Sequence, residues 1–221
     1  MGFWSKVGKL ASVVVEKAPD ILSALAAEGA KRQAEAQQRY AKQIYEYERK
    51  LRRAEANANQ MSAEEREKLR QASLQLNMAK EKLNSRGIQV SDSGKILLGG
   101  KSLEEWNRQW KSIGYLKYAD LTPYNKCVGL YRHRIGSKVM YVGRAIELNN
   151  GGFRKRLSDY RRESDSARKH KSGRLIHEHL DQIVTDIIVV GDTEEAVKLT
   201  KALEILFIAK YNPPWNKQIG F

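Results

Sequence analysis

The stretch GLYRHRIGSKVMYVG, residues 129–143, decides the expected fold of the C-terminal half of this 221-residue chain. It is nearly a palindrome, because GLY at its start is matched by YVG at its end. Residues 128–134 and 138–144 are rich in apolar and aromatic side chains, and Gly136 lies between them. Two such segments joined by a short glycine-containing turn predict a β-hairpin.

The register of this hairpin determines where its two tyrosines lie. A three-residue loop, Ile135-Gly136-Ser137, would place Tyr131 opposite Tyr141, with the phenols on one face and their Cβ atoms about 5 Å apart. A two-residue loop, Gly136-Ser137, would shift the register by one residue and send the tyrosines to opposite faces. The mirrored sequence favours the first register. The other face would then carry apolar residues suited to a core: Leu130, Met140 and Val142.

The segments after the hairpin complete a small α+β domain. Residues 152–163 predict a helix and residues 181–191 a buried strand. Residues 192–212 predict a long helix, which Pro213-Pro214 ends. We therefore expect residues 128–221 to form a small three-stranded antiparallel sheet flanked by helices.

The charge of the chain points to a polyanionic partner. It has 40 Lys and Arg against 26 Asp and Glu, a formal net charge of +14. Residues 129–180 hold 13 Lys and Arg against 5 Asp and Glu, an excess of eight on a quarter of the chain. Such an excess beside paired tyrosines predicts a phosphate-binding surface. The partner is either nucleic acid or an anionic membrane surface.

One carboxylate lies in an otherwise apolar helical segment. Glu204 is the charged residue of ALEILFIA, residues 202–209. A helix that is apolar on all sides is buried, and a buried carboxylate is costly unless it is paired, protonated or bound to metal. The expected partner of Glu204 is either Arg156 or a divalent cation. Oxygen ligation with open water positions would suit Mg²⁺.

Several motifs in the same order resemble the GIY-YIG nuclease superfamily, over residues 128 to about 218. GLY and YVG match the two motifs that name the family, and RKRLSDY, residues 154–160, matches its helix motif. The loop before that helix is longer than in compact members. The family's functional positions correspond here to Tyr131, Tyr141, Arg156, Tyr160, Glu204 and Asn216.

The resemblance implies an endonuclease that hydrolyses DNA phosphodiester bonds with one Mg²⁺ or Mn²⁺ ion. In this scheme Tyr131 accepts a proton from the attacking water and Tyr141 positions that water, although the two phenols are interchangeable on this evidence. A free phenol has a pKa near 10, so the arginine and the metal are expected to lower it by about 3 units. The other implied roles are phosphate charge neutralisation by Arg156, metal binding by Glu204, a phosphate hydrogen bond from Tyr160, and pocket ordering by Asn216.

Basic and histidine side chains around these positions are expected to contact DNA. Arg144 stands where some family members have lysine, and because arginine cannot accept a proton, we expect it to bind phosphate. His177 and His179 flank Glu178 and predict a surface or DNA-facing position. An alternative function is a non-catalytic nucleic-acid-binding or scaffold protein, and the biological role of a nuclease stays open. The expected nucleic-acid contacts are His133, Arg144, Arg154, Lys155, Arg161, Arg162 and Lys171.

The N-terminal half has a different amino-acid composition. Residues 28–87 have a helix-forming composition with apolar positions at 3-4 spacing, and Ser62 to Glu65 predict a capping box. This predicts a helical hairpin or one long coiled-coil-like helix, which could join two subunits into a homodimer. Residues 88–127 predict a connecting β-hairpin and a helix carrying Trp106 and Trp110 on one face.

The first 27 residues and the single cysteine set the expected environment. Residues 1–27 predict an amphipathic segment that packs on protein or, as an alternative, on a membrane surface. Cys127 is the single cysteine, so an internal disulfide is excluded and a reducing, cytoplasmic location is expected.

Overall fold

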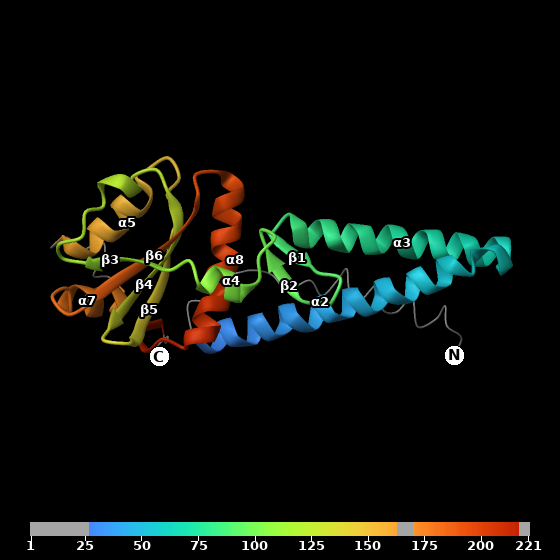
Figure 1. Cartoon of the computed structure of the whole chain (residues 1–221), viewed down its shortest axis with the longest axis horizontal. Coiled ribbons are helices and arrows are strands. Elements are labelled where there is room, and N and C mark those ends of the chain that lie inside the picture. Colours follow the sequence, from blue (N-terminus) through green and yellow to red (C-terminus); the bar gives the residue numbers. More distant parts are fainter. Residues whose placement is uncertain (1–26, 163–169, 217–221) are drawn as a thin grey trace. The chain divides into compact units, whose positions relative to one another are not determined.

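A computed structural model describes residues 27–162 and 170–216 (Figure 1). The expected amphipathic segment 1–27, with its membrane-surface alternative, lies outside these residues except for its last position. Contacts divide the described chain into two compact units. The first contains residues 35–102, and the second contains residues 27–34 and 103–216.

The first unit is built on two antiparallel helices, so the hairpin alternative is confirmed over the single long helix. Helix α2 is Ala27–Ala56, η1 is Ala58–Gln60 and α3 is Ala63–Asn84. Across the pair, the Lys80 ammonium lies 2.9 Å from the Glu48 carboxylate. The buried seam consists of Tyr40, Ile44, Tyr47, Leu51 and Ala54 on α2 and Leu69, Ala72, Leu76, Ala79 and Leu83 on α3.

Two local predictions in this unit are confirmed. The Ser62 hydroxyl accepts a hydrogen bond from the Glu65 backbone N–H, and the Glu65 carboxylate accepts one from the Ser62 N–H, which is the predicted capping box. The predicted connecting hairpin consists of β1, Ile88–Val90, paired antiparallel with β2, Ile96–Leu98.

The second unit confirms the α+β class but contains a four-stranded antiparallel sheet rather than a three-stranded one. The strand order is β3-β6-β4-β5, so β3 and β5 are its edges. The unexpected strand precedes residue 128, and four of its five residues are exposed, which removes the alternating pattern that marks a strand. The strands are β3 Lys111–Tyr115, β4 Val128–Ile135, β5 Lys138–Ala145 and β6 Val184–Gly191.

Helices cover both faces of this sheet (Figure 1). Helices α5 and α7 pack on the face that carries Tyr131, and α8 packs on the other face. Thr193 caps α8 by accepting a hydrogen bond from the Ala196 N–H. The helical segments are α4 Leu103–Asn107, η2 Thr122–Tyr124, α5 Gly152–Arg161, α7 Lys171–Glu178, α8 Glu194–Tyr211 and η3 Pro214–Asn216.

The expected helix carrying two tryptophans is shorter than predicted. Helix α4 ends at Asn107, so Trp110 does not share a helical face with Trp106. Trp110 instead packs edge-on against Phe207 of α8, with ring centroids 5.3 Å apart. The chain leaves the helix early because Lys111 begins β3, whose pairing with β6 requires extended backbone.

The predicted register of the β4–β5 hairpin is wrong, although its tyrosines do share a face. The turn has two residues, with Ile135 opposite Lys138, and an irregularity between His133 and Arg134 leaves Met140 without a partner in the ladder. Tyr141 therefore faces His133, and Tyr131 faces Gly143. Each deviation shifts the register by one residue, so together they restore the face that the two-residue turn alone would have reversed.

Gly143 creates the space that the tyrosines occupy. A Cβ atom added at this glycine would lie 2.5 Å from the Tyr131 hydroxyl and 2.7 Å from a ring carbon of Tyr141. The space that a side chain at this position would need is thus filled by the Tyr131 ring. At Gly129 the neighbour is backbone, since an added Cβ would meet the Ile188 carbonyl.

Candidate functional site

Three tyrosines and one histidine from β4, β5 and α5 form a cluster on the α5 side of the sheet. We call Tyr131, Tyr141, Tyr160 and His133 the tyrosine cluster. The Tyr131 and Tyr160 hydroxyls lie 2.8 Å apart, and the Tyr131 and Tyr141 ring centroids lie 6.1 Å apart. The His133 ring stacks on Tyr141 at 6.0 Å. The hairpin β4–β5 and helix α5 together bring three phenols into contact, although Tyr131 and Tyr160 are 29 residues apart in the chain.

The phenols of the cluster are neutral at pH 7. Burial raises the pKa of Tyr131 and of Tyr141 well above the usual value, and it also raises the pKa of Tyr160. Arg156 lowers all three pKa values, but its effect is smaller than that of burial. The expectation that arginine would help to bring a phenol pKa towards neutrality is therefore not met in the protein alone.

The two name-giving tyrosines differ in their access to the surface. Tyr131 is 1 % exposed, whereas Tyr141 is half-buried on the edge strand β5. Tyr141 is accordingly the phenol that a substrate or a water molecule would meet first. Tyr131 lies behind it and holds Tyr160 through the hydroxyl contact.

Arg156 of α5 supplies the positive charge next to the phenols. Its guanidinium lies 2.7 Å from the Glu147 carboxylate, and its side chain keeps 39 % of its exposure. Burial works against its charge, but Glu147 and the phenol oxygens raise the pKa of Arg156 overall. The group is a partly exposed cation held beside three hydroxyls, which is suited to binding phosphate.

Glu147 is a residue of the site that the sequence reasoning missed. It lies in the loop between β5 and α5, for which the sequence predicted only a greater length than in compact GIY-YIG members. The available signal was its isolation, since it is an acidic residue within a strongly basic stretch. Its carboxylate fixes the orientation of the Arg156 side chain.

Glu204 of α8 contributes a buried carboxylate close to the same groups. Its side chain is 14 % exposed, and burial raises its pKa to about 6, against the lowering effects of Arg144 and Arg156. It also contributes to the raised pKa values of Tyr141 and Tyr160, although the helix that carries it packs on the opposite face of the sheet. Its ion-pair partner is Arg144, at 2.7 Å, and not Arg156 as expected.

Asn216 ties the C-terminal segment to the strand that carries Tyr141. Its amide nitrogen donates to the Val142 carbonyl and its amide oxygen accepts from the Val142 N–H, each at 2.8 Å. Val142 is on the edge strand β5, whose outer backbone groups have no neighbouring strand. The side chain therefore takes the place of a strand partner next to the cluster.

Several expected nucleic-acid contacts have other roles in the structure. His133 is fully buried, with its Nδ1 atom 2.9 Å from the Thr185 hydroxyl, so it does not reach a bound substrate. Arg144 is paired with Glu204 rather than free for phosphate. Arg161 donates a 2.5 Å hydrogen bond to the Ala119 carbonyl.

The histidines near α7 are structural as well. The His177 ring hydrogen-bonds the Tyr160 carbonyl at 2.8 Å, and the His179 ring contacts the Leu175 carbonyl and packs against Trp215. Both histidines are half-buried, so their rings keep some exposure at the surface, and a contact with DNA stays a prediction.

The remaining basic residues gather at the surface. Arg154, Arg162 and Lys171 are exposed, and Lys155 is half-buried. At the first turn of α5 a hollow of about 260 Å³ receives three of these side chains. Its lining residues are Asn125, Asn150, Gly151, Arg154, Lys155, Ser158 and Arg162.

A divalent cation such as Mg²⁺ takes oxygen ligands, so the carboxylates of the site determine whether it can bind there. Within residues 27–162 and 170–216, no group of three or more His, Cys, Asp or Glu side chains could hold a metal ion. Mg²⁺ needs only one or two protein carboxylates, with water and substrate phosphate completing its shell. Glu204 provides one such carboxylate, so the residues fit Mg²⁺ once Arg144 yields part of its contact.

Comparison of the chain with known proteins returned nothing that bears on this site: no family model, no curated protein and no solved structure matches it. Over the described residues, no helix has the length and apolar character needed to cross a membrane.

Proposed function

We propose that this protein is a divalent-cation-dependent endonuclease that hydrolyses DNA phosphodiester bonds, the activity implied by its resemblance to GIY-YIG nucleases. The observation that carries the proposal is the cluster of Tyr131, Tyr141, Tyr160 and Arg156 on one face of the sheet, together with the buried Glu204, which contacts the edge strand β5 through Arg144 from the helix on the other face. These five side chains come from four separate elements, β4, β5, α5 and α8.

Arg156 is the residue that binds and stabilises the scissile phosphate in this proposal. Its guanidinium is partly exposed and is oriented by Glu147 at 2.7 Å, so little reorganisation is needed when charge develops on the phosphate oxygens. The exposed Arg154 and Arg162 on the same segment of chain extend the positive surface along the DNA backbone.

Tyr141 contacts the attacking water or a phosphate oxygen, because it is the more accessible of the two name-giving phenols. Tyr131 and Tyr160 form the hydroxyl pair that keeps the phenols in position. The motif alone left the two phenols interchangeable, and their difference in exposure favours Tyr141 for this contact. Since the phenols are neutral at pH 7, the fraction in the phenolate form is small and rises with pH.

Glu204 is the carboxylate that would hold Mg²⁺ or Mn²⁺. A bound divalent cation would act as a Lewis acid that stabilises negative charge on the leaving oxygen. The carboxylate is held at the edge strand β5 by Arg144, at 2.7 Å. Arg144 is thus a positioning residue of the site rather than a phosphate contact.

Cleavage of supercoiled plasmid in Mg²⁺ tests the proposal. We expect Arg156→Ala to lower the rate by about 10²- to 10³-fold, the loss observed when one preorganised donor to a transition-state charge is removed. Glu204→Gln should remove the dependence of the rate on the divalent cation. Exposed residues away from the cluster provide matched controls, Arg108→Ala for the guanidinium and Glu178→Gln for the carboxylate.

The result also separates the alternative function. Binding of DNA by the wild type with no cleavage in Mg²⁺ or Mn²⁺ would identify a non-catalytic nucleic-acid-binding protein. Cleavage by Arg156→Ala at the wild-type rate would remove Arg156 from the site.

A further inference from the structure

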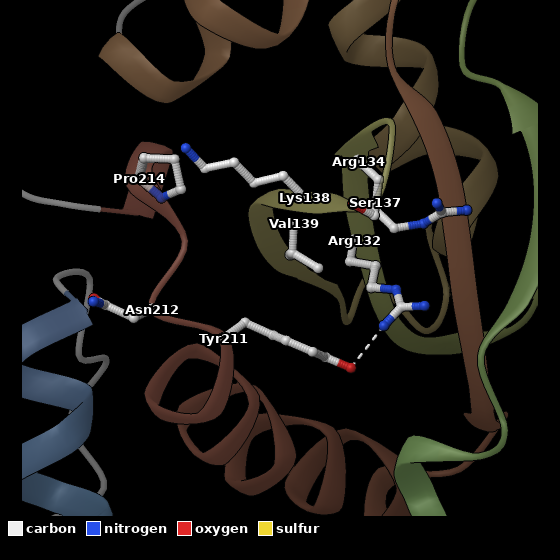
Figure 2. Close-up of a pocket in the computed structure, with 8 residues that line it drawn as sticks. All are labelled: Arg132, Arg134, Ser137, Lys138, Val139, Tyr211, Asn212 and Pro214. Atoms are coloured by element: carbon white, nitrogen blue, oxygen red, sulfur yellow. Dashed lines mark hydrogen bonds between the residues drawn. The ribbon is translucent and has the colours of Figure 1, made fainter.

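A second cluster of basic side chains lies on the face of the sheet opposite the tyrosine cluster. Along β4, Arg132 and Arg134 alternate with Tyr131 and His133, so the two pairs point to opposite faces. The arginines line a cavity of about 410 Å³ between the β4–β5 turn and the end of α8 (Figure 2). We call it the arginine pocket; it is lined by Arg132, Arg134, Ser137, Lys138, Val139, Tyr211, Asn212 and Pro214.

The arginine pocket carries more positive than negative charge. The buried Asp186 of β6 accepts hydrogen bonds from the Arg132 Nε at 2.7 Å and from the Arg134 Nε at 2.6 Å. These two contacts lower the pKa of Asp186 although burial opposes them, so this carboxylate is ionised and neutralises one guanidinium. Lys138 lines the same cavity and has no ion-pair partner among the described residues. Three cations thus stand against one carboxylate, which leaves an excess of two positive charges.

The guanidinium groups are held in fixed positions. Arg132 lies over the Trp110 ring, 4.7 Å from its centroid. It also donates a 2.6 Å hydrogen bond to the Tyr211 hydroxyl, drawn as the dashed line in Figure 2. Arg134 donates a further hydrogen bond to the Gly136 carbonyl at 2.9 Å. Each guanidinium has five N–H groups, so both retain donors beyond those used here. Fixed donors bind an anion without paying the entropy of ordering long side chains.

We propose that the arginine pocket binds a backbone phosphate of the DNA, away from the scissile phosphate. The phosphate lies against the remaining donors of Arg132 and Arg134, and the adjoining deoxyribose lies against Val139 and Pro214. Lys138, on the solvent side of the pocket, contacts the same phosphate. The identity of the polyanion rests on the proposed function, while the site itself rests on the geometry of the pocket. The β4–β5 hairpin would then contact the DNA backbone from both of its faces.

Fluorescence anisotropy with a labelled DNA duplex, measured over a range of salt concentrations, tests this site. Lys138→Ala should weaken affinity by roughly tenfold and reduce the slope of log affinity against log salt by about 1. Ser137→Glu adds a negative charge at an exposed lining position and should weaken binding further. The control is Lys198→Ala, an exposed lysine of α8 that does not line the pocket.

The outcomes distinguish this inference from the proposed function. Wild-type affinity and salt slope in both pocket variants, with DNA still cut, would overturn the inference alone. Absence of both DNA binding and cleavage in the wild type would overturn the proposed function and this inference together. A mononucleotide whose binding is sensitive to Lys138→Ala, while duplex binding is not, would assign the pocket to a small phosphate ligand and would also contradict the inference.

Discussion

Glu204→Gln should stabilise the protein at neutral pH while it removes the proposed cation ligand. Burial of Glu204 raises its pKa to about 6 from the reference value of 4.5, in spite of the Arg144 ion pair. A carboxyl group whose pKa is higher in the folded state binds its proton more tightly there. Its ionised form therefore destabilises the fold above about pH 6, and this effect disappears below about pH 4.5.

The size of the effect follows from that difference. A shift of about 1.5 units corresponds to about 2 kcal/mol at 1.36 kcal/mol per unit. Glutamine resembles the protonated acid and does not ionise. The free energy of unfolding of Glu204→Gln should thus exceed that of the wild type by about 2 kcal/mol at pH 8. The difference should shrink between pH 6 and 4.5 and vanish at pH 4.

Urea unfolding followed by tryptophan fluorescence measures this difference, because Trp106, Trp110 and Trp215 all lie in the second unit. Glu195→Gln on the same helix serves as a control of opposite sign. The Glu195 carboxylate accepts hydrogen bonds from its own backbone N–H and from the Thr193 hydroxyl, which lower the pKa of Glu195. Its stabilising effect is therefore present above the unfolded pKa and is lost as the pH falls through the folded one. A Glu204→Gln variant less stable than the wild type at pH 8 would refute the reasoning, since the Arg144 pair would then outweigh the cost of burial.

Four further predictions concern the site and its supports. If a phenolate is the proton acceptor, the cleavage rate should rise about tenfold per pH unit between pH 7 and 9, because the pKa of Tyr141 is raised above its usual value; a flat profile would exclude that role. Gly143→Ala should abolish cleavage and cost about 1–3 kcal/mol, since the added methyl would overlap the Tyr131 ring; wild-type activity in this variant would contradict the packing described. Asn216→Ala should lower the free energy of unfolding by about 3 kcal/mol, because it leaves two backbone groups of β5 without their partner; circular dichroism during urea titration measures this. Ser62→Ala should destabilise the first unit by about 1 kcal/mol through loss of its helix cap, with no change in cleavage.

The shared face of the two tyrosines could be predicted from the sequence, whereas the register could not. Which face a side chain occupies depends only on whether the register shifts by an even or an odd number of residues. The observed register differs from the expected one by two residues, so the tyrosines stay on the same face. The two-residue turn and the unpaired Met140 each shift the ladder by one, and neither has a local sequence signal distinct from the loop that was expected. The helices α5 and α8 were predicted because their apolar spacing and end signals are local.

The ion pairs of the site depend on tertiary structure and escaped prediction. Glu204 was expected to be buried, and it is. Its partner Arg144 lies 60 residues earlier in the chain, on β5, and no local pattern connects the two residues. Glu147 and Arg156 are separated by a loop whose conformation has no periodic pattern. Strand β3 was missed because four of its five residues are exposed and its pairing with β6 is irregular.

The most direct test of the account uses one end-labelled DNA duplex with protein in excess, so that binding and cleavage are measured in the same samples. The wild type should cut the strand in Mg²⁺ and stop when EDTA is added. Arg156→Ala and Glu204→Gln should each cut at least about 100-fold more slowly while binding the duplex within a few-fold of the wild type. A wild-type protein that binds the duplex and leaves it intact in both Mg²⁺ and Mn²⁺, or an Arg156→Ala variant that cuts as fast as the wild type, would contradict it.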